Sequence, residues 1–278
     1  MLNRISLGPL GVVAAALLVT ASTSWAGFQY EDFSSVAELT LVGDATQENS
    51  AVRVSPAAGW TAGGAWYSSK QAVAGGFTST FTYRITARGP GGGRADGFAF
   101  VVQNDSATAL GEDGEALGYG IDEYGAGQAG GIPNSLAVEF DTYRHFEFDE
   151  ATPNHVSVQT RGLLPNSAHP QYSLGTTNGV AALDDEVVHT VIVHYDAQQL
   201  EVYVDDPLTP LLTVPVDLSS VLDLDAGSAW VGFTASSGAY WENHEILSWS
   251  FVPEPCTLGL LSVGCLALVR CRRRQAGA

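Results

Sequence analysis

Cysteine is absent from most of this 278-residue chain. The three cysteines, Cys256, Cys265 and Cys271, all lie close to the C-terminus, so no disulfide can cross-link the residues before them. The preceding domain must therefore be stabilised by a hydrophobic core. It also contains no reactive cysteine and no visible serine–histidine–aspartate spacing, which argues against nucleophilic catalysis.

Helical periodicity is also missing between Gly27 and Phe251. Glycine, serine, threonine and aromatic residues instead form short alternating runs between turn clusters, with no internal repeat and no domain linker. Strands are predicted at residues 77–87, 97–103, 190–195, 200–204, 230–235 and 245–251. Many short strands without helices predict one all-β sandwich, and the nearly continuous apolar run at 97–103 predicts a strand covered on both faces.

Basic residues are scarce, with 12 Lys and Arg against 30 Asp and Glu, and the net charge is −18. Such a surface repels phosphate backbones, so nucleic acid is excluded as a partner. Clustered acids suit divalent cations, although solubility outside the cell accounts for most of them equally well.

Both ends of the chain have the composition of processing segments. Residues 1–26 contain Arg4, an apolar run from Ile5 to Val19, and the small-x-small sequence Ser24-Trp25-Ala26. This pattern is typical of a secretory signal peptide, which signal peptidase would remove before Gly27.

The other end, residues 252–278, begins Val-Pro-Glu-Pro and continues with an apolar run at 256–269 and a cluster of arginines. The run is short for a stable membrane span, and the arginines would remain inside. The segment resembles a PEP-CTERM sorting signal. That resemblance implies an exosortase partner, transient anchoring by the tail, and a final place in the cell envelope or outside the cell.

Residues 134–159 contain the densest set of chemically active side chains. Glu139, Asp141 and Tyr143 share one face of a predicted strand because side chains alternate with period two. If a second strand around His155 pairs with the first as a hairpin, this histidine falls beside the two carboxylates.

Several carboxylates crowd this hairpin and its loop, and they would repel one another unless a cation neutralised them. Carboxylates suit Ca²⁺, and an imidazole among them adds a preference for an ion such as Mn²⁺. The candidate metal residues are Glu139, Asp141, Tyr143, His145, Asp149, Glu150 and His155. From the residues alone, a solvated acidic loop is an equally good interpretation.

Residues 111–131 form a long glycine-rich segment. Its backbone N–H groups could approach a ligand closely, or the segment could be a mobile surface loop. It is not a phosphate loop, since no Gly-Lys-Ser/Thr ends it and no helix follows.

Four stretches, residues 95–105, 130–143, 189–196 and 231–251, together with the hairpin ending at His155, resemble the L-type (legume-like) lectin family in family order. The match extends over nearly all of residues 27–251. It implies a concanavalin A-like jelly-roll of two large antiparallel sheets and an exported protein that binds glycans such as exopolysaccharide. Since flat lectin sheets often pair, a homodimer is a further expectation.

The resemblance also implies roles for individual residues. Glu139, Asp141, Asp149 and His155 would hold Mn²⁺ or another transition ion, while Asp141, the Tyr143 carbonyl and Asp149 would hold Ca²⁺. Asp96 would bind the sugar after a cis Ala95–Asp96 peptide. The full set of candidate sugar-binding residues is Asp96, Gly118, Gly130, Gly131, Tyr143, His145, Phe146, Ser237 and Gly238.

The chain departs from the family pattern at a few positions. His145 stands where the family usually has a calcium-binding asparagine, and the spacing to His155 allows Glu150 to replace Asp149. Ser157 and Gln159 stand at the family's glycine and aspartate positions.

Three functions are therefore compared. The first is a carbohydrate-binding protein without catalytic activity, and the second is a structural envelope protein with a degenerate sugar site. The third is a concanavalin-fold glycoside hydrolase using Glu139 and Asp141. The hydrolase is disfavoured because Arg144 occupies the position of the required second acid, and we expect no enzyme activity.

Overall fold

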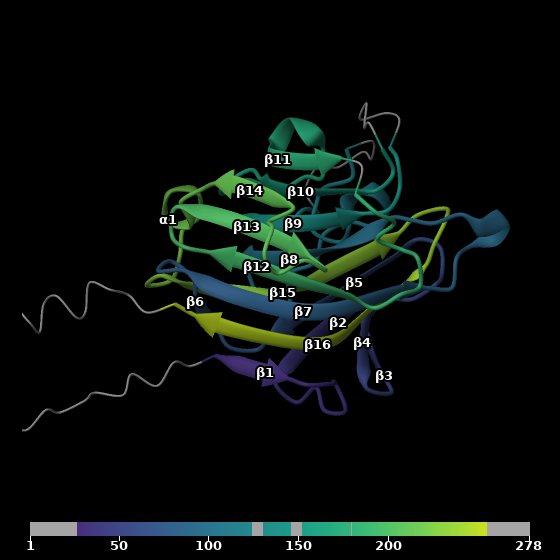
Figure 1. The fold of residues 1–278 in the computed structure, drawn as a ribbon, viewed down its shortest axis with the longest axis horizontal. Coiled ribbons are helices and arrows are strands. Elements are labelled where there is room, and N and C mark those ends of the chain that lie inside the picture. Colours follow the sequence, from purple (N-terminus) through teal and green to yellow (C-terminus); the bar gives the residue numbers. More distant parts are fainter. Residues whose placement is uncertain (1–26, 124–129, 146–151, 179, 255–278) are drawn as a thin grey trace, which may run out of the picture.

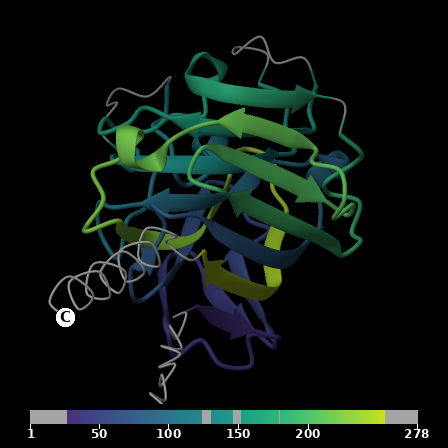
Figure 2. The ribbon, with the colours of Figure 1, turned by 60° about the vertical axis from the view of Figure 1, so that its left-hand side comes forward.

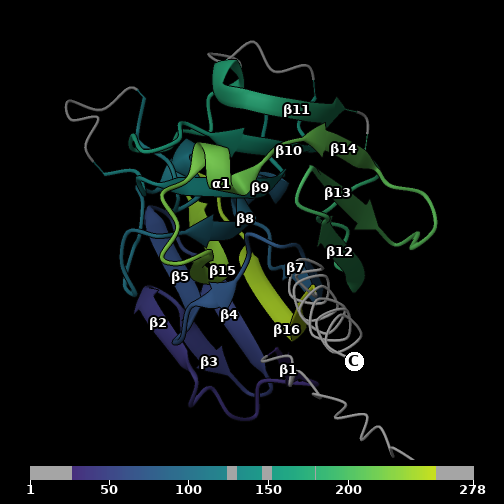
Figure 3. The same cartoon turned by 90° about the vertical axis from the view of Figure 1, so that its left-hand side faces the viewer.

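The structure, a computed structural model, describes residues 27–123, 130–145, 152–178 and 180–254. Both predicted processing segments, apart from residues 252–254, lie outside these ranges, as do Phe146, Asp149 and Glu150. The described residues form two eight-stranded sheets with antiparallel pairing, as the predicted sandwich requires (Figure 1). Figure 3 shows the sheets as two stacked layers.

The first sheet contains, in spatial order, β14 (Leu212–Pro215), β13 (Gln199–Val204), β12 (His189–Tyr195), β7 (Phe77–Thr86), β16 (Asn243–Pro253), β4 (Ala51–Ser55) and β3 (Thr46–Glu48), with β1 (Phe28–Tyr30) also paired to β16. The second contains β11 (Ser173–Asn178), β10 (His155–Thr160), β9 (Ser135–Asp141), β8 (Gly97–Gln103), β15 (Ser228–Ser237), β5 (Thr61–Tyr67) and β2 (Leu39–Gly43), with β6 (Gln71–Ala72) also paired to β15. The edge strands β11 and β14 lie side by side (Figure 2).

Helical structure is limited to single turns in the described part of the chain. These are the 3₁₀ turns η1 (Pro90–Gly92), η2 (Gly114–Ala116) and η4 (Pro170–Tyr172), and the α-helical turn α1 (Leu218–Val221). None of the described helices has the length and apolar character needed to cross a membrane.

The strands follow the sequence pattern closely. Buried and partly exposed residues alternate along the whole of β7, because one face meets the opposite sheet and the other meets solvent. Every residue of β8 is buried, as its continuous apolar run predicts. Its second face is covered by Leu117 and Tyr119 from the glycine-rich segment, which belong to the smaller of two hydrophobic clusters.

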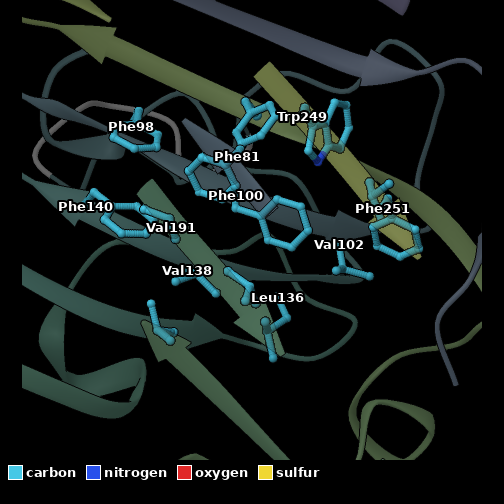
Figure 4. Packing of buried hydrophobic residues seen from close by; sticks show 14 of the residues in the cluster. Phe81, Phe98, Phe100, Val102, Leu136, Val138, Phe140, Val191, Trp249 and Phe251 are labelled. Carbon is cyan, nitrogen blue, oxygen red and sulfur yellow. The ribbon is translucent and has the colours of Figure 1, made fainter. Parts of the chain in front are cut away.

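The main core lies between the sheets and is rich in aromatic side chains (Figure 4). Phe98 and Phe140, from neighbouring strands, stack with ring centroids 4.7 Å apart. Phe81 from the opposite sheet meets Phe233 edge to face at 4.9 Å. Burial of such large rings, worth about 2–3 kcal/mol each, stabilises the domain without disulfides.

The hairpin predicted around residue 139 is present as the β9–β10 pair. Its register places His155 opposite Asp141 and Ser157 opposite Glu139. The histidine and the two carboxylates therefore gather on one face, as the period-two pattern predicted.

Candidate functional site

Asp96 lies just before β8, at the edge where several loops converge. The Ala95–Asp96 peptide is cis, as the family resemblance implied. The Asp96 N–H donates to the Ser236 carbonyl at 3.1 Å, and its own carbonyl accepts the Thr142 N–H at 3.0 Å. The Ser237 hydroxyl donates to the Ala95 carbonyl at 3.2 Å. Two segments far away in sequence, at Thr142 and at residues 236–237, thus fix the backbone of this aspartate.

The carboxylate of Asp96 is an acceptor held at the base of the site. The residue is only 3% exposed, and its Oδ2 accepts no hydrogen bond of good geometry from the described residues. Burial raises the pKa of Asp96 well above its ordinary value, the Glu115 carboxylate raises it further, and the Gly238 N–H opposes the increase. A ligand that donates hydroxyl hydrogens would satisfy this buried oxygen and favour the charged form.

Gly238 leaves room above that carboxylate. A Cβ added there would lie 3.2 Å from Asp96 Oδ2 and 3.4 Å from Gly114 Cα. Gly114 is itself tied to this loop, because its carbonyl accepts the Ser236 hydroxyl at 2.6 Å. The predicted pair Ser237 and Gly238 therefore lies directly against Asp96.

Aromatic rings surround the same position. The rings of Tyr143 and His145 meet edge to face at 4.9 Å, and Tyr143 lies 6.1 Å from Tyr240 between centroids. His145 Nε2 is 3.5 Å from Asp96 Oδ1, so His145 reaches the predicted sugar-binding acid. Tyr240 is 43% exposed and offers an apolar surface that the sequence analysis did not single out.

The predicted glycines occupy different positions. Gly118 is buried, and its N–H donates to the Glu112 carbonyl at 3.1 Å, so this amide already serves the loop itself. Gly131 is also buried, whereas Gly130 is partly exposed. The described part of the glycine-rich segment is thus packed against the sheet through η2 and the residues after it. That a glycine of this segment faces the ligand stays a prediction.

Glu139 is the most enclosed of the predicted metal residues, with 1% exposure. Its Oε1 accepts the Ser157 hydroxyl at 2.6 Å and the Gln159 amide at 3.0 Å, while Oε2 accepts the Tyr119 hydroxyl at 2.5 Å. His155 Nε2 lies 3.5 Å from Oε1. Burial works to raise the pKa of Glu139, but His155 and the hydroxyl donors outweigh it and lower the pKa.

Asp141 is 2% exposed and lies where β9 ends. Its Oδ1 accepts the Tyr143 N–H at 2.7 Å, a contact that folds the chain tightly after the strand. A carboxylate is an oxygen ligand of the kind that calcium prefers, so Asp141 itself suits that ion. The predicted partners Asp149 and Glu150 lie outside the described residues.

The surroundings of Glu139 fit a transition ion poorly. The oxygen that faces His155 already accepts two hydrogen bonds from protein donors. Across the described ranges, no group of three or more His, Cys, Asp or Glu side chains is arranged to hold a metal ion. A buried and fully hydrogen-bonded Glu139 also lacks the access that a glycosidase nucleophile needs.

Thr142 and Glu242 were missed by the sequence analysis. The Thr142 hydroxyl donates to Glu242 Oε1 at 2.5 Å, and Glu242 is fully buried. Period-two alternation gave no signal for this contact, because the two residues are separated by 100 positions. Glu115, whose carboxylate acts on Asp96, was also missed, because period-two alternation does not connect a residue in the glycine-rich segment with Asp96.

The comparisons with known proteins agree with this geometry. The family model for the legume lectin domain matches residues 25–256. The chain therefore belongs to the legume lectin domain family, and the jelly-roll architecture expected from the resemblance is confirmed.

Individual relatives come from plants. The structure of a Bauhinia forficata lectin in complex with GalNAc matches with a TM-score of 0.68 and 26% identity, covering 84% of this chain and 100% of that one. The metal-free form of Griffonia simplicifolia lectin I-B4 matches with a TM-score of 0.66 and 25% identity, covering 82% and 99%.

A probable L-type lectin-domain containing receptor kinase VII.2 of Arabidopsis thaliana is 30% identical over 175 residues, which are 59% of this chain and 24% of the relative. The chain thus matches about a quarter of that receptor kinase.

Proposed function

We propose that this protein is a lectin without enzyme activity, which binds a glycan at Asp96. The observation that carries the proposal is the buried Asp96 carboxylate, whose Oδ2 meets no aligned donor among the described residues while glycine Gly238 leaves space beside it. Two neighbouring sugar hydroxyls would donate to this carboxylate. Charge-assisted hydrogen bonds of this kind are short and strong in a site that excludes water.

The rim supplies the rest of the recognition. Tyr143 and Tyr240 would stack on the apolar face of a pyranose, and His145, 3.5 Å from Asp96, would direct a ring nitrogen toward a hydroxyl. Phe146, Ser237 and the glycines Gly130 and Gly131 remain candidates for the remaining contacts. The named Bauhinia neighbour, in complex with GalNAc, supports a small sugar as the ligand class.

A calcium ion would brace this site, held by Asp141, the Tyr143 carbonyl and either Asp149 or Glu150. When bound, it would neutralise the carboxylates and fix the loop that follows β9. The sugar contacts themselves belong to the side chains around Asp96. Family membership supports this brace, and the Asp141 carboxylate is an oxygen ligand of the kind that calcium prefers.

Isothermal titration calorimetry against a panel of monosaccharides and exopolysaccharides tests the proposal. We expect binding that weakens with a chelator, and no release of reducing ends. Asp96→Asn should weaken binding at least 100-fold, about 2.7 kcal/mol, because the amide presents donors to the sugar hydroxyls. Asp105→Asn, an exposed site beyond β8, is the matched control.

Equal glycan binding by wild type and Asp96→Asn would reject the assigned site. No binding to any glycan would favour the structural envelope protein, and release of reducing ends would favour the hydrolase.

We also propose that residues 1–26 direct export and that residues 252–278 sort the protein through an exosortase to the cell envelope or the outside. Strand β16 continues to Pro253, which pairs with Phe77, and the Glu254 N–H donates to the Gly76 carbonyl at 2.8 Å. Mass spectrometry of the exported protein tests this, with a mature start at Gly27 expected. Retention of residues 1–26 would contradict it.

A further inference from the structure

The hydroxyl and amide donors to Glu139 come from two places in the chain. Ser157 and Gln159 lie on β10 beside β9, and Tyr119 comes from the glycine-rich segment. Each of these side chains is at most 1% exposed. The Gln159 amide also donates to the Ser157 hydroxyl at 2.9 Å and to the Ala168 carbonyl at 3.4 Å, so its orientation is determined by several acceptors.

These donors use the same oxygen that an ion would need. A carboxylate oxygen has two lone pairs, and Oε1 already accepts two hydrogen bonds, from Ser157 and Gln159. Oε1 is also the oxygen 3.5 Å from His155 Nε2, where an ion shared by Glu139 and His155 would bind. Such an ion would have to displace a donor and leave a buried hydroxyl or amide unsatisfied.

The third donor connects this carboxylate to the sugar site. Tyr119 is fully buried in the second hydrophobic cluster and donates from the outer face of the sheet to Glu139 Oε2. The same segment carries Gly114, whose carbonyl accepts the Ser236 hydroxyl near Asp96. The Tyr119–Glu139 bond thus holds the glycine-rich segment to the hairpin.

We propose that this hydrogen-bonded set replaces the transition ion of the family, so that the protein folds around Glu139 without Mn²⁺ or a similar ion. The inference deepens the proposed function, because it assigns the fixing of the glycine-rich segment beside the sugar site to Tyr119, Ser157 and Gln159. The calcium position at Asp141 is left unchanged.

Titration of the chelator-treated full chain with Mn²⁺ alone, with Ca²⁺ in saturating excess, tests the proposal. Free Mn²⁺ is followed by its electron paramagnetic resonance signal. Wild type should bind no Mn²⁺ in the micromolar range, whereas Ser157→Gly combined with Gln159→Asp should bind it at least 100-fold more tightly. The double substitution removes both donors from Oε1 and adds a carboxylate. Micromolar binding of one Mn²⁺ by wild type, lost in Glu139→Gln, would overturn the proposal.

Thermal unfolding provides a second measurement if the double variant does not fold. Tyr119→Phe should lower the melting temperature by several degrees, equally with Mn²⁺ and after its removal, while Tyr203→Phe on the outer face of the other sheet should not. A large loss of wild-type stability on removal of Mn²⁺ would contradict the proposal. Neither measurement uses a glycan, so a failure to bind sugar would refute the proposed function without affecting this result.

Discussion

The Thr142 hydroxyl donates to Glu242 Oε1 at 2.5 Å in the buried floor of the site. Because the Thr142 N–H also donates to the Asp96 carbonyl, one threonine joins the end of β9, the Asp96 loop and the loop that carries Tyr240. His244 Nε2 lies 3.6 Å from the same Glu242 oxygen. The position of Asp96, the proposed sugar-binding acid, therefore depends on the contact between Thr142 and Glu242.

Thr142→Val should destabilise the protein by about 2–3 kcal/mol, because the buried Glu242 loses a donor while the side-chain volume is conserved. Urea unfolding measures this change. Thr213→Val, at an exposed position of β14, should stay within about 0.5 kcal/mol of wild type. Equal effects of the two substitutions would show that the Glu242 contact does not stabilise the site.

Gly97→Ala should destabilise the protein by about 2–4 kcal/mol and abolish glycan binding. Gly97 follows Asp96 with φ +131°, and an added Cβ would meet the Phe140 carbonyl oxygen and lie 2.9 Å from a Leu117 methyl carbon. Gly91→Ala is the control, because Gly91 also has a positive φ, +69°, but no atom within 4 Å of an added Cβ. It should cost only about 1 kcal/mol. Thermal unfolding measures the stability of both variants, and calorimetry measures their glycan binding. Equal losses in the two variants would contradict the prediction.

Tyr240→Ala should weaken glycan binding about 5- to 10-fold, or about 1–1.4 kcal/mol, with little change in stability because the ring is 43% exposed. Tyr240→Phe should retain most of the affinity if the ring face is what contacts the sugar. Tyr203→Ala, on β13 of the other sheet, is the matched control. Unchanged affinity in Tyr240→Ala would place the sugar away from this ring.

Glu115 should make stability decrease as the pH rises. Burial raises its pKa to about 7 from 4.5, and the neighbouring Asp122 carboxyl contributes. Since the folded pKa is the higher one, the protonated acid stabilises the fold fully below pH 4.5, and this contribution is lost as the pH rises through about 7. Glu115 is partly solvated, so the loss amounts to about 1 kcal/mol after screening.

Urea unfolding at pH 5 and pH 8 measures this contribution. Glu115→Gln should remove about 1 kcal/mol of the wild-type difference between the two pH values, and the exposed Glu31→Gln should not. A wild-type difference that persists unchanged in Glu115→Gln would assign the pH dependence to other carboxyl groups.

The strands and the hairpin could be predicted because their signal is local. The alternation in residues 77–87 and the continuous apolar run at 97–103 depend only on near neighbours, and the structure places β7 and β8 there. The meeting of His155 with Glu139 followed from the same period, once the two strands were paired. The family resemblance added Asp96, which no spacing argument connected to the hairpin.

The sequence by itself thus determined the all-β class, the buried faces and the gathering of acids around residue 139. Only the tertiary structure decided how those acids are satisfied. Tyr119, Ser157 and Gln159 surround Glu139, and Thr142 meets Glu242, because packing brings together side chains from strands and loops that are distant along the chain. A hydrogen bond forms only where donor and acceptor lie within about 3 Å and are well aligned, and a one-dimensional pattern carries no such distance.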